Sequence, residues 1–190
     1  MGSNPKTVSG LTGDLAVHNG TYTITYSSAF SFPNTDQKEY RMFSASENNQ
    51  YSETNNNMRA SADIAQNLYS STLDGNGYPY VGNNSLTYYD NSDNLVTVNG
   101  EWIAFEFPAY INFTVFHSLS DDYSRAATFI GVDSTGTNRL IGSYSNTLQN
   151  GGWTSENLTS NYYVNKFYWV ITKKSKNDTN YMQFHEIFFD

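Results

Sequence analysis

The sequence predicts an all-β protein, an antiparallel jelly-roll-type β-sandwich of about eight strands. The clearest strand spans residues 100–108, where Ile103, Phe105 and Phe107 alternate with the polar Glu106, so that one face is apolar. Asn, Ser and Thr occupy 24, 22 and 19 of the 190 positions, whereas charged residues make up only 15%. This composition favours turns and hydroxyl-lined strands over amphipathic helices. Aromatic residues, at 16%, supply side chains for a core between two layers.

The other strands follow from the same alternation. In the first strand, residues 21–25, Tyr22 and Ile24 alternate with threonines. Pro108 is expected to end the strand described above, because proline has no N–H to donate. Residues 166–172 are apolar on both faces, which predicts a strand in the centre of a sheet. Further strands are expected at residues 40–45, 111–118, 128–132, 139–144 and 181–189.

Turns and loops are expected between these strands. Turn residues at 133–138 predict a hairpin, and a Gly-Gly turn is expected within residues 149–153. Long loops are expected at residues 46–57, 73–82 and 83–99, with one helical turn at 60–69. Residues 1–20 are polar and rich in glycine, which indicates an N-terminal arm or cap. The expected organisation is therefore this arm followed by a single sandwich, residues 21–190, with long loops at one end.

Charge and cysteine content exclude several classes of protein. With 18 acidic and 10 basic residues the net charge is −8, so we expect neither a nucleic-acid partner nor attraction to an anionic membrane surface. The chain has no cysteine, which rules out disulfides and Cys-based zinc sites. No apolar run approaches the roughly 20 residues that span a bilayer, and the N-terminus lacks a secretory signal pattern. We therefore expect a soluble domain that is stabilised by packing alone.

Several short motifs occur in an order that resembles a known family. They are Gly100-Glu-Trp-Ile103, Arg125 ahead of Phe129-Ile-Gly-Val-Asp133, Gly136-Thr-Asn138 with Leu140-Ile141, Tyr168-Trp-Val-Ile-Thr-Lys173 and His185-Glu-Ile-Phe-Phe189. This order resembles the discoidin, or coagulation-factor C-type, galactose-binding-like sandwich, over about residues 21–190. The form with the early Gly-Glu-Trp-Ile strand and the late Val-Ile-Thr-Lys strand is similar to domains in structural proteins of large DNA viruses of algae and protists.

The chain departs from this family at three points. Arg139 stands where the family usually has Trp after its Asp-Gly-Thr-type hairpin, and Ala126 stands where Pro often follows the Arg near position 125. The stabilising cystine of the animal members is absent. These departures concern the ligand more than the fold.

The resemblance implies a non-catalytic protein that binds glycans, lipids or proteins through loops at one end of the sandwich. Our leading hypothesis is a virion structural protein, a minor capsid or capsid-surface component that contacts other capsid or surface proteins or the host. The alternative is a stand-alone lectin-like module that binds extracellular carbohydrate, with or without calcium. The expected location is accordingly the virion, or the extracellular space in the alternative.

Sugar binding requires an exposed aromatic face with amide and acid groups nearby. The candidates in predicted loops are Tyr78, Tyr80, Tyr88, Tyr89 and Trp153. In a chain with 16 tyrosines, the alternative interpretation is that these side chains cap the ends of the sandwich or lie in an interface.

Many members of this fold hold a calcium ion between an early Asp-Gly-Asn-type loop and a glutamate on the last strand. The resemblance implies Asp74, in Asp74-Gly-Asn76, and Glu186 as the ligands, and calcium prefers such hard oxygens. The alternative is that Asp74 only forms a turn and that Glu186 accepts buried backbone hydrogen bonds. No other cofactor is expected.

We expect no enzymatic activity. His18, His117 and His185 are scattered, and the motifs of zinc proteases, serine hydrolases and phosphate-binding loops are absent. His185 and Glu186 are neighbours on a strand, so they point to opposite faces and cannot act together. The remaining enzymatic alternative is a glycosidase with paired carboxylates, because that pairing is spatial and leaves no local motif.

Overall fold

The computed structural model describes residues 6–15, 18–27, 58–60, 69–75, 77–120, 124–145, 152–158, 161–175 and 182–189. The strand expected at 40–45, the loop at 46–57, most of the helical turn at 60–69 and most of the turn at 149–153 lie outside these residues. Every regular element in the described part of the chain is a β-strand. In that part, no helix has the length and apolarity that crossing a membrane requires.

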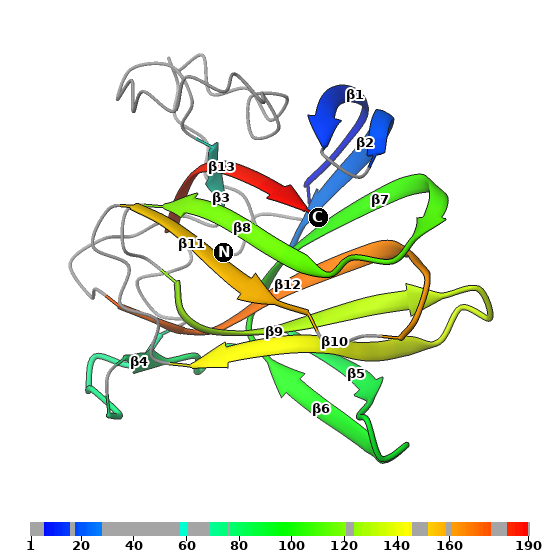
Figure 1. Cartoon of the computed structure of the whole chain (residues 1–190). Helices are drawn as coiled ribbons and strands as arrows, with labels where there is room; N and C mark the ends of the chain where they lie inside the picture. Colours follow the sequence, from blue (N-terminus) through cyan, green and yellow to red (C-terminus); the bar gives the residue numbers. More distant parts are fainter. Residues whose placement is uncertain are drawn as a thin grey trace.

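The strands form two sheets that lie one above the other (Figure 1). The larger sheet contains β1 (Lys6–Leu15), β2 (His18–Tyr26), β4 (Tyr78–Pro79), β5 (Ser85–Tyr89), β6 (Leu95–Asn99), β7 (Glu101–Ile111), β9 (Ser124–Asp133), β10 (Asn138–Ser145) and β12 (Val164–Lys174). The smaller sheet contains β3 (Met58–Ala60), β8 (Val115–Ser120), β11 (Gly152–Asn157) and β13 (Met182–Phe189). The β-sandwich predicted from the sequence is confirmed, with more strands than the eight expected.

Strand order places β12 in the middle of the larger sheet, which runs β1-β2-β7-β12-β9-β10-β5-β6 with β4 attached to β12. Trp169 of β12 lies opposite Ile103 of β7 and Phe129 of β9. Cross-strand pairs of aromatic and branched side chains stabilise antiparallel sheets. The central position predicted for residues 166–172 is therefore confirmed. Gly100 precedes β7 at a close approach, because an added Cβ would lie 2.5 Å from the Ile171 carbonyl oxygen.

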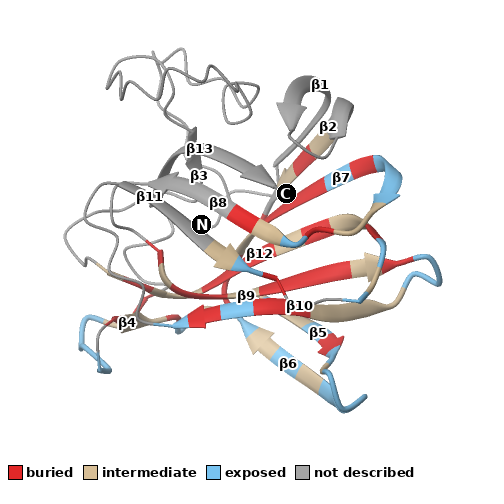
Figure 2. Ribbon diagram, viewed as in Figure 1, coloured by how far each residue is buried: buried red, intermediate tan, exposed pale blue. Residues whose placement is uncertain are grey.

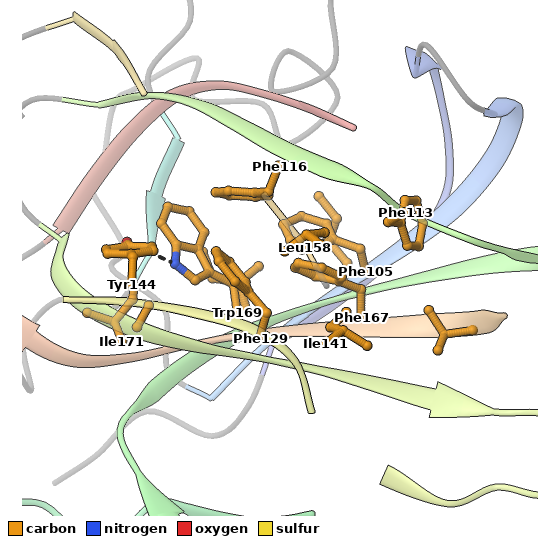
Figure 3. Packing of buried hydrophobic residues seen from close by; sticks show 14 of the residues in the cluster. Phe105, Phe113, Phe116, Phe129, Ile141, Tyr144, Leu158, Phe167, Trp169 and Ile171 are labelled. Carbon is orange, nitrogen blue, oxygen red and sulfur yellow. Dashed lines mark hydrogen bonds between the residues drawn. The ribbon is translucent and has the colours of Figure 1, made fainter. Parts of the chain in front are cut away.

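Aromatic side chains from both layers fill the space between the sheets (Figure 3). Figure 2 shows the buried stretches of β7, β9 and β12 in the larger sheet. The Phe116 ring of β8 lies 4.9 Å from the Trp169 ring and 4.7 Å from the Phe129 ring, measured between centroids. The Trp169 side chain is fully buried, and its Nε1–H donates to the Tyr144 hydroxyl at 3.2 Å, as the dashed line in Figure 3 shows. The core thus joins β8 of one sheet to β9, β10 and β12 of the other.

The strand predicted around residues 100–108 has the expected apolar face. Ile103, Phe105 and Phe107 are 1%, 0% and 2% exposed, whereas Glu106 is exposed. These three side chains belong to the main core cluster. The alternation in the sequence therefore identified the buried face of β7.

Two expected strand ends were wrong. β7 continues past Pro108 to Ile111. The register between β7 and β12 shifts between Glu106 and Ile111, so the ladder needs no N–H from the proline. Residues 112–114 are irregular, so the next strand begins at Val115 and not at residue 111. This break changes which side chains of the following strand face the core, so that Phe116 is buried.

Residues 83–99 were expected to form a long loop, but they contain the antiparallel hairpin of β5 and β6. Its turn is fixed by Asp90, whose Oδ1 accepts the backbone N–H groups of Ser92 at 2.8 Å and Asn94 at 2.9 Å. Such Asp-capped turns replace backbone hydrogen bonds locally. The abundance of Asn and Asp in 90–94 therefore marks the turn of a hairpin and not a long irregular loop.

This hairpin covers part of the outer face of the larger sheet. Tyr88 of β5 packs against Ile130 of β9 and Val170 of β12, which point away from the main core. The three side chains are at most 9% exposed. Burial on both faces explains why the central strands carry apolar residues at successive positions.

β1 and β2 pair with each other, and β2 continues the larger sheet by pairing with β7. Residues 6–15, which belong to the expected arm, therefore form an edge strand. The division into an arm, residues 1–20, and a sandwich, residues 21–190, remains a prediction.

Candidate functional site

The central strand β12 defines two ends of the sandwich. Val164, its first residue, pairs with Asp133 of β9, and Lys174, its last residue, pairs with Tyr78 of β4. At about 3.3 Å per residue, the two ends of this strand lie about 30 Å apart. We name them the Val164 end and the Lys174 end.

Tyr78 and Tyr80 lie at the Lys174 end and are largely withdrawn from solvent. Tyr78 is half-buried and packs against the main core. Tyr80 is 9% exposed, its ring meets the Tyr69 ring edge-on at 5.3 Å, and its hydroxyl donates to Glu101 Oε1 at 3.1 Å. Burial raises the pKa of Tyr80 to about 12. Both tyrosines pack at this end of the core, and their role in ligand binding remains a prediction.

Glu101 is the buried acid around which this end is organised. Its carboxylate is 1% exposed, and Oε2 accepts the Ser27 hydroxyl at 2.7 Å. Oε1 accepts the Tyr80 hydroxyl and, at 2.7 Å, the Asn84 side-chain amide. A buried carboxylate bonded in this way stabilises the fold but offers no open face to a ligand.

Asp74 lies at the Lys174 end in a tight turn. Its Oδ2 pairs with the Lys173 ammonium group at 2.9 Å, and the same ammonium group donates to its carbonyl oxygen at 3.1 Å. Gly75, with φ of +64°, forms the turn. A lysine bound to both oxygens opposes a second cation there, so Asp74 fits a calcium ion poorly in this arrangement.

Glu186, the other expected calcium ligand, lies on β13 of the smaller sheet, where its backbone pairs with Leu119 of β8. Its side chain lies outside the described residues. Among the residues the structure describes, no cluster of three or more acidic or histidine side chains is placed to hold a metal ion. Calcium binding by Asp74 and Glu186 remains a prediction.

Tyr88 and Tyr89 are neighbours on β5, so their side chains point to opposite faces of the sheet. Tyr88 points inward to the outer-face cluster and is 9% exposed, whereas Tyr89 points to solvent and is 37% exposed. Tyr89 pairs with Arg139 of β10, which places it at the Val164 end beside the hairpin of residues 133–138. The structure therefore places Tyr89 toward the Val164 end of β12 and Tyr78 and Tyr80 toward its Lys174 end.

Arg139 is the centre of a cluster of two aromatic and two acidic side chains at the Val164 end. Its guanidinium carbon lies over the Tyr89 ring at 5.3 Å and over the Tyr162 ring at 5.1 Å from the ring centroids. Its Nη1 pairs with Asp93 Oδ1 at 2.7 Å, and its Nε pairs with Asp133 Oδ2 at 3.3 Å. We call these five residues the arginine cluster.

Asp133 is held rigidly by its own turn. Its Oδ1 accepts the hydroxyl and the N–H of Thr135 at 2.6 and 2.9 Å and the N–H of Thr137 at 3.0 Å. Burial acts to raise the pKa of Asp133, but these hydrogen bonds and the one from Arg139 outweigh it and hold the pKa below its ordinary value. Asp133 therefore stays charged and fixes Arg139 in position.

Two further tyrosines are exposed at the Val164 end. Tyr163 precedes Val164 and is 64% exposed, and Tyr110 precedes Ile111, the partner of Val164, and is 46% exposed. Tyr89 is also exposed, so the three large aromatic side chains that the structure describes as exposed all lie at this end. The Val164 end thus combines aromatic faces with fixed charged groups.

Sequence reasoning identified Tyr89 but missed most of its partners. Arg139 was visible only as a departure from the family pattern, and Tyr162 lies outside every motif. Asp93 lies in a segment that was expected to be a long loop. Trp153 lies on β11, but its side chain lies outside the described residues, so its proposed role is untested.

Neither a family model nor a curated protein matches this sequence. Among solved structures 34 chains match, including the chitosan-binding module 1 derived from a chitosanase/glucanase of Paenibacillus sp. IK-5, which is 13% identical over 93% of this chain and 98% of its own, with a TM-score of 0.49. The family 32 carbohydrate-binding module of Streptococcus pneumoniae EndoD is 7% identical over 47% of this chain and 68% of its own, with a TM-score of 0.41.

A putative chitobiase fragment from Bacteroides thetaiotaomicron is 9% identical over 47% of this chain, with a TM-score of 0.42. The matched region spans 59% of that fragment, less than two thirds of its length. At these identities and TM-scores, what these modules bind does not carry over to this chain. The site must therefore be interpreted from its own residues.

Proposed function

We propose that this protein is a non-catalytic carbohydrate-binding module whose ligand site is the arginine cluster. The observation that carries the proposal is the Tyr89 ring, which is 37% exposed and is held in place by Arg139 at the end of the sandwich. An exposed aromatic ring fixed beside charged hydrogen-bonding groups matches the chemistry of a sugar, which has apolar C–H faces and a rim of hydroxyl groups.

The cluster is already ordered before a ligand arrives. Asp133 is fixed by its turn, Arg139 is fixed by Asp133 and Asp93, and Tyr89 is packed against Arg139. A preformed site loses little side-chain entropy on binding, so more of the contact energy appears as affinity. Carboxylates accept hydrogen bonds and a guanidinium group donates them, so the cluster can bind a sugar hydroxyl group either as its donor or as its acceptor.

The acidic groups do not favour hydrolysis. A glycosidase needs a general acid with a raised pKa beside a second carboxylate. The pKa of Asp133 is lowered instead, and Glu101 is buried at the other end of the sandwich, where it accepts hydrogen bonds from Ser27, Tyr80 and Asn84. These properties support binding without turnover.

The lectin-like alternative from the sequence is thus better supported than the virion role. The arginine cluster offers a small-molecule site, and the proposed location of the module is extracellular. The virion role, with capsid or surface proteins as partners, remains a prediction that none of the described contacts supports.

Replacing Tyr89 with alanine is expected to weaken glycan binding about tenfold, or about 1.4 kcal/mol, because the stacking face is lost. The measurement is a glycan array with neutral, cationic and anionic members, followed by calorimetric titration of the strongest ligand. The control is Leu73→Ala, which removes an exposed apolar side chain, 56% exposed, near the Lys174 end. The proposal fails if no glycan binds, or if Tyr89→Ala and Leu73→Ala bind equally well.

A further inference from the structure

The arginine cluster carries more negative than positive charge. Asp90 and Asp93 come from the β5–β6 turn and Asp133 from the β9–β10 turn, and Arg139 is the cation that these turns share. Asp93 occupies a left-handed backbone conformation, with φ of 59°, that usually favours glycine or asparagine. A carboxylate thus stands at a position where a neutral asparagine would also fit the backbone.

Arg139 offers no net positive charge to an anionic ligand, because two carboxylates already pair with it. Its guanidinium group already pairs with Asp93 and Asp133, and it lies over two tyrosine rings. A sugar carboxylate or sulfate that reached the remaining N–H groups of Arg139 would lie close to the carboxylates of Asp93 and Asp133. Like charges at such a distance repel, so the cluster disfavours acidic glycans.

The three lysines whose side chains the structure describes do not change this balance. Lys166 pairs with Glu106 at 3.2 Å, and Lys173 pairs with Asp74 at 2.9 Å near the Lys174 end. Lys174 is buried at 1% exposure. With a net charge of −8, the whole chain adds a negative field to the local one.

The same groups suit a cation. The Asp93 side chain is 79% exposed and holds Arg139 through Oδ1, so its other oxygen is open to an approaching donor. Tyr89 and Tyr162 already hold one cation, the Arg139 guanidinium group, over their rings. Rings and carboxylates together are the usual means by which proteins recognise ammonium groups.

We infer that the arginine cluster selects saccharides that carry protonated amines, such as oligomers of glucosamine, over neutral and acidic saccharides of the same linkage. This inference rests on the proposed function, carbohydrate binding, and further specifies that the preferred saccharide is positively charged. The amine would pair with Asp93 while the sugar ring stacks on Tyr89.

The test compares three β-1,4-linked hexamers that differ in charge, namely glucosamine, N-acetylglucosamine and mannuronate. Each is titrated calorimetrically into the full chain at about pH 5.5, where the sugar amines of the glucosamine hexamer are protonated. The glucosamine hexamer is expected to bind about tenfold more tightly than the N-acetylglucosamine hexamer, and the mannuronate hexamer most weakly. Raising NaCl from about 0.05 M to about 0.5 M is expected to remove most of this preference.

A pair of variants separates the site from the overall charge. Asp93→Asn is expected to lower the preference for the glucosamine hexamer about threefold. Asp74→Asn removes the same charge from another exposed ion pair, with the Asp74 side chain 69% exposed, near the Lys174 end. It is expected to leave the preference unchanged.

The outcomes distinguish this inference from the proposed function. Equal or tighter binding of the neutral or acidic hexamer overturns the inference but leaves carbohydrate binding in place. Failure to bind the glucosamine hexamer also overturns it, and the glycan array then decides separately whether another glycan is recognised. Equal effects of Asp93→Asn and Asp74→Asn would mean that the preference comes from the net charge of the chain and not from the arginine cluster, which also overturns the inference.

Discussion

Glu101→Leu is expected to lower the free energy of unfolding by about 3–5 kcal/mol, because it removes a buried acceptor and leaves its donors without partners. Among the described residues these donors include the hydroxyl groups of Ser27 and Tyr80 and the side-chain amide of Asn84. Ser27 is 7% exposed and Tyr80 is 9% exposed, so water cannot easily replace the carboxylate there. The loss should be visible in urea denaturation followed by far-ultraviolet circular dichroism.

The matched control lies on the same strand. Glu106→Leu removes a carboxylate that is 50% exposed and pairs with Lys166, so its cost should stay below about 1 kcal/mol. Glu101→Gln keeps one acceptor and should fall between the two leucine variants. Equal stability of the Glu101→Leu and Glu106→Leu variants would contradict the organising role of Glu101.

Trp169→Ala is expected to destabilise the protein by about 3–5 kcal/mol, since it empties the centre of the core. The Trp169 ring lies between β8 and the larger sheet, in contact with Phe116, and its Nε1–H donates to Tyr144 (Figure 3). Unfolding free energies of small domains are about 5–15 kcal/mol, so this loss removes a large fraction of the total. Trp169→Phe keeps most of the ring and should cost about 1–2 kcal/mol.

Tyr168→Ala provides the comparison for the opposite face of β12. Tyr168 is half-buried and meets Trp102 edge-on at 5.4 Å on the outer side of the sheet. Its truncation should cost less than that of Trp169, about 1–2 kcal/mol. A larger loss for Tyr168→Ala would mean that the main core does not lie between the two sheets.

The fold could be predicted because its strongest signals are local. The alternation of Ile103, Phe105 and Phe107 identified the core face of β7, and the two apolar faces of residues 166–172 placed β12 in the centre. The β5–β6 hairpin was missed because its long turn, rich in Asn and Asp, resembles a loop in composition. The structure shows that Asp90 organises this turn.

The site was harder to predict because its members come from three separate segments. Tyr89 and Asp93 belong to one hairpin, Asp133 and Arg139 to another, and Tyr162 precedes β12. No fixed spacing in the sequence links them. The only hint of the site in the sequence was Arg139, which stands where the family that the sequence resembles usually has tryptophan. In the structure, Arg139 pairs with two acidic side chains and lies over two tyrosine rings.

The central claim is that ligand binds at the Val164 end of the sandwich and not at the Lys174 end. It is tested most directly by two-dimensional ¹H–¹⁵N NMR of the labelled chain during titration with the glucosamine and N-acetylglucosamine hexamers. The account predicts that amide resonances shift in residues 87–94, 133–140 and 161–164. Shifts confined to residues 69–84 and 171–175, or no shifts with either hexamer, would contradict it.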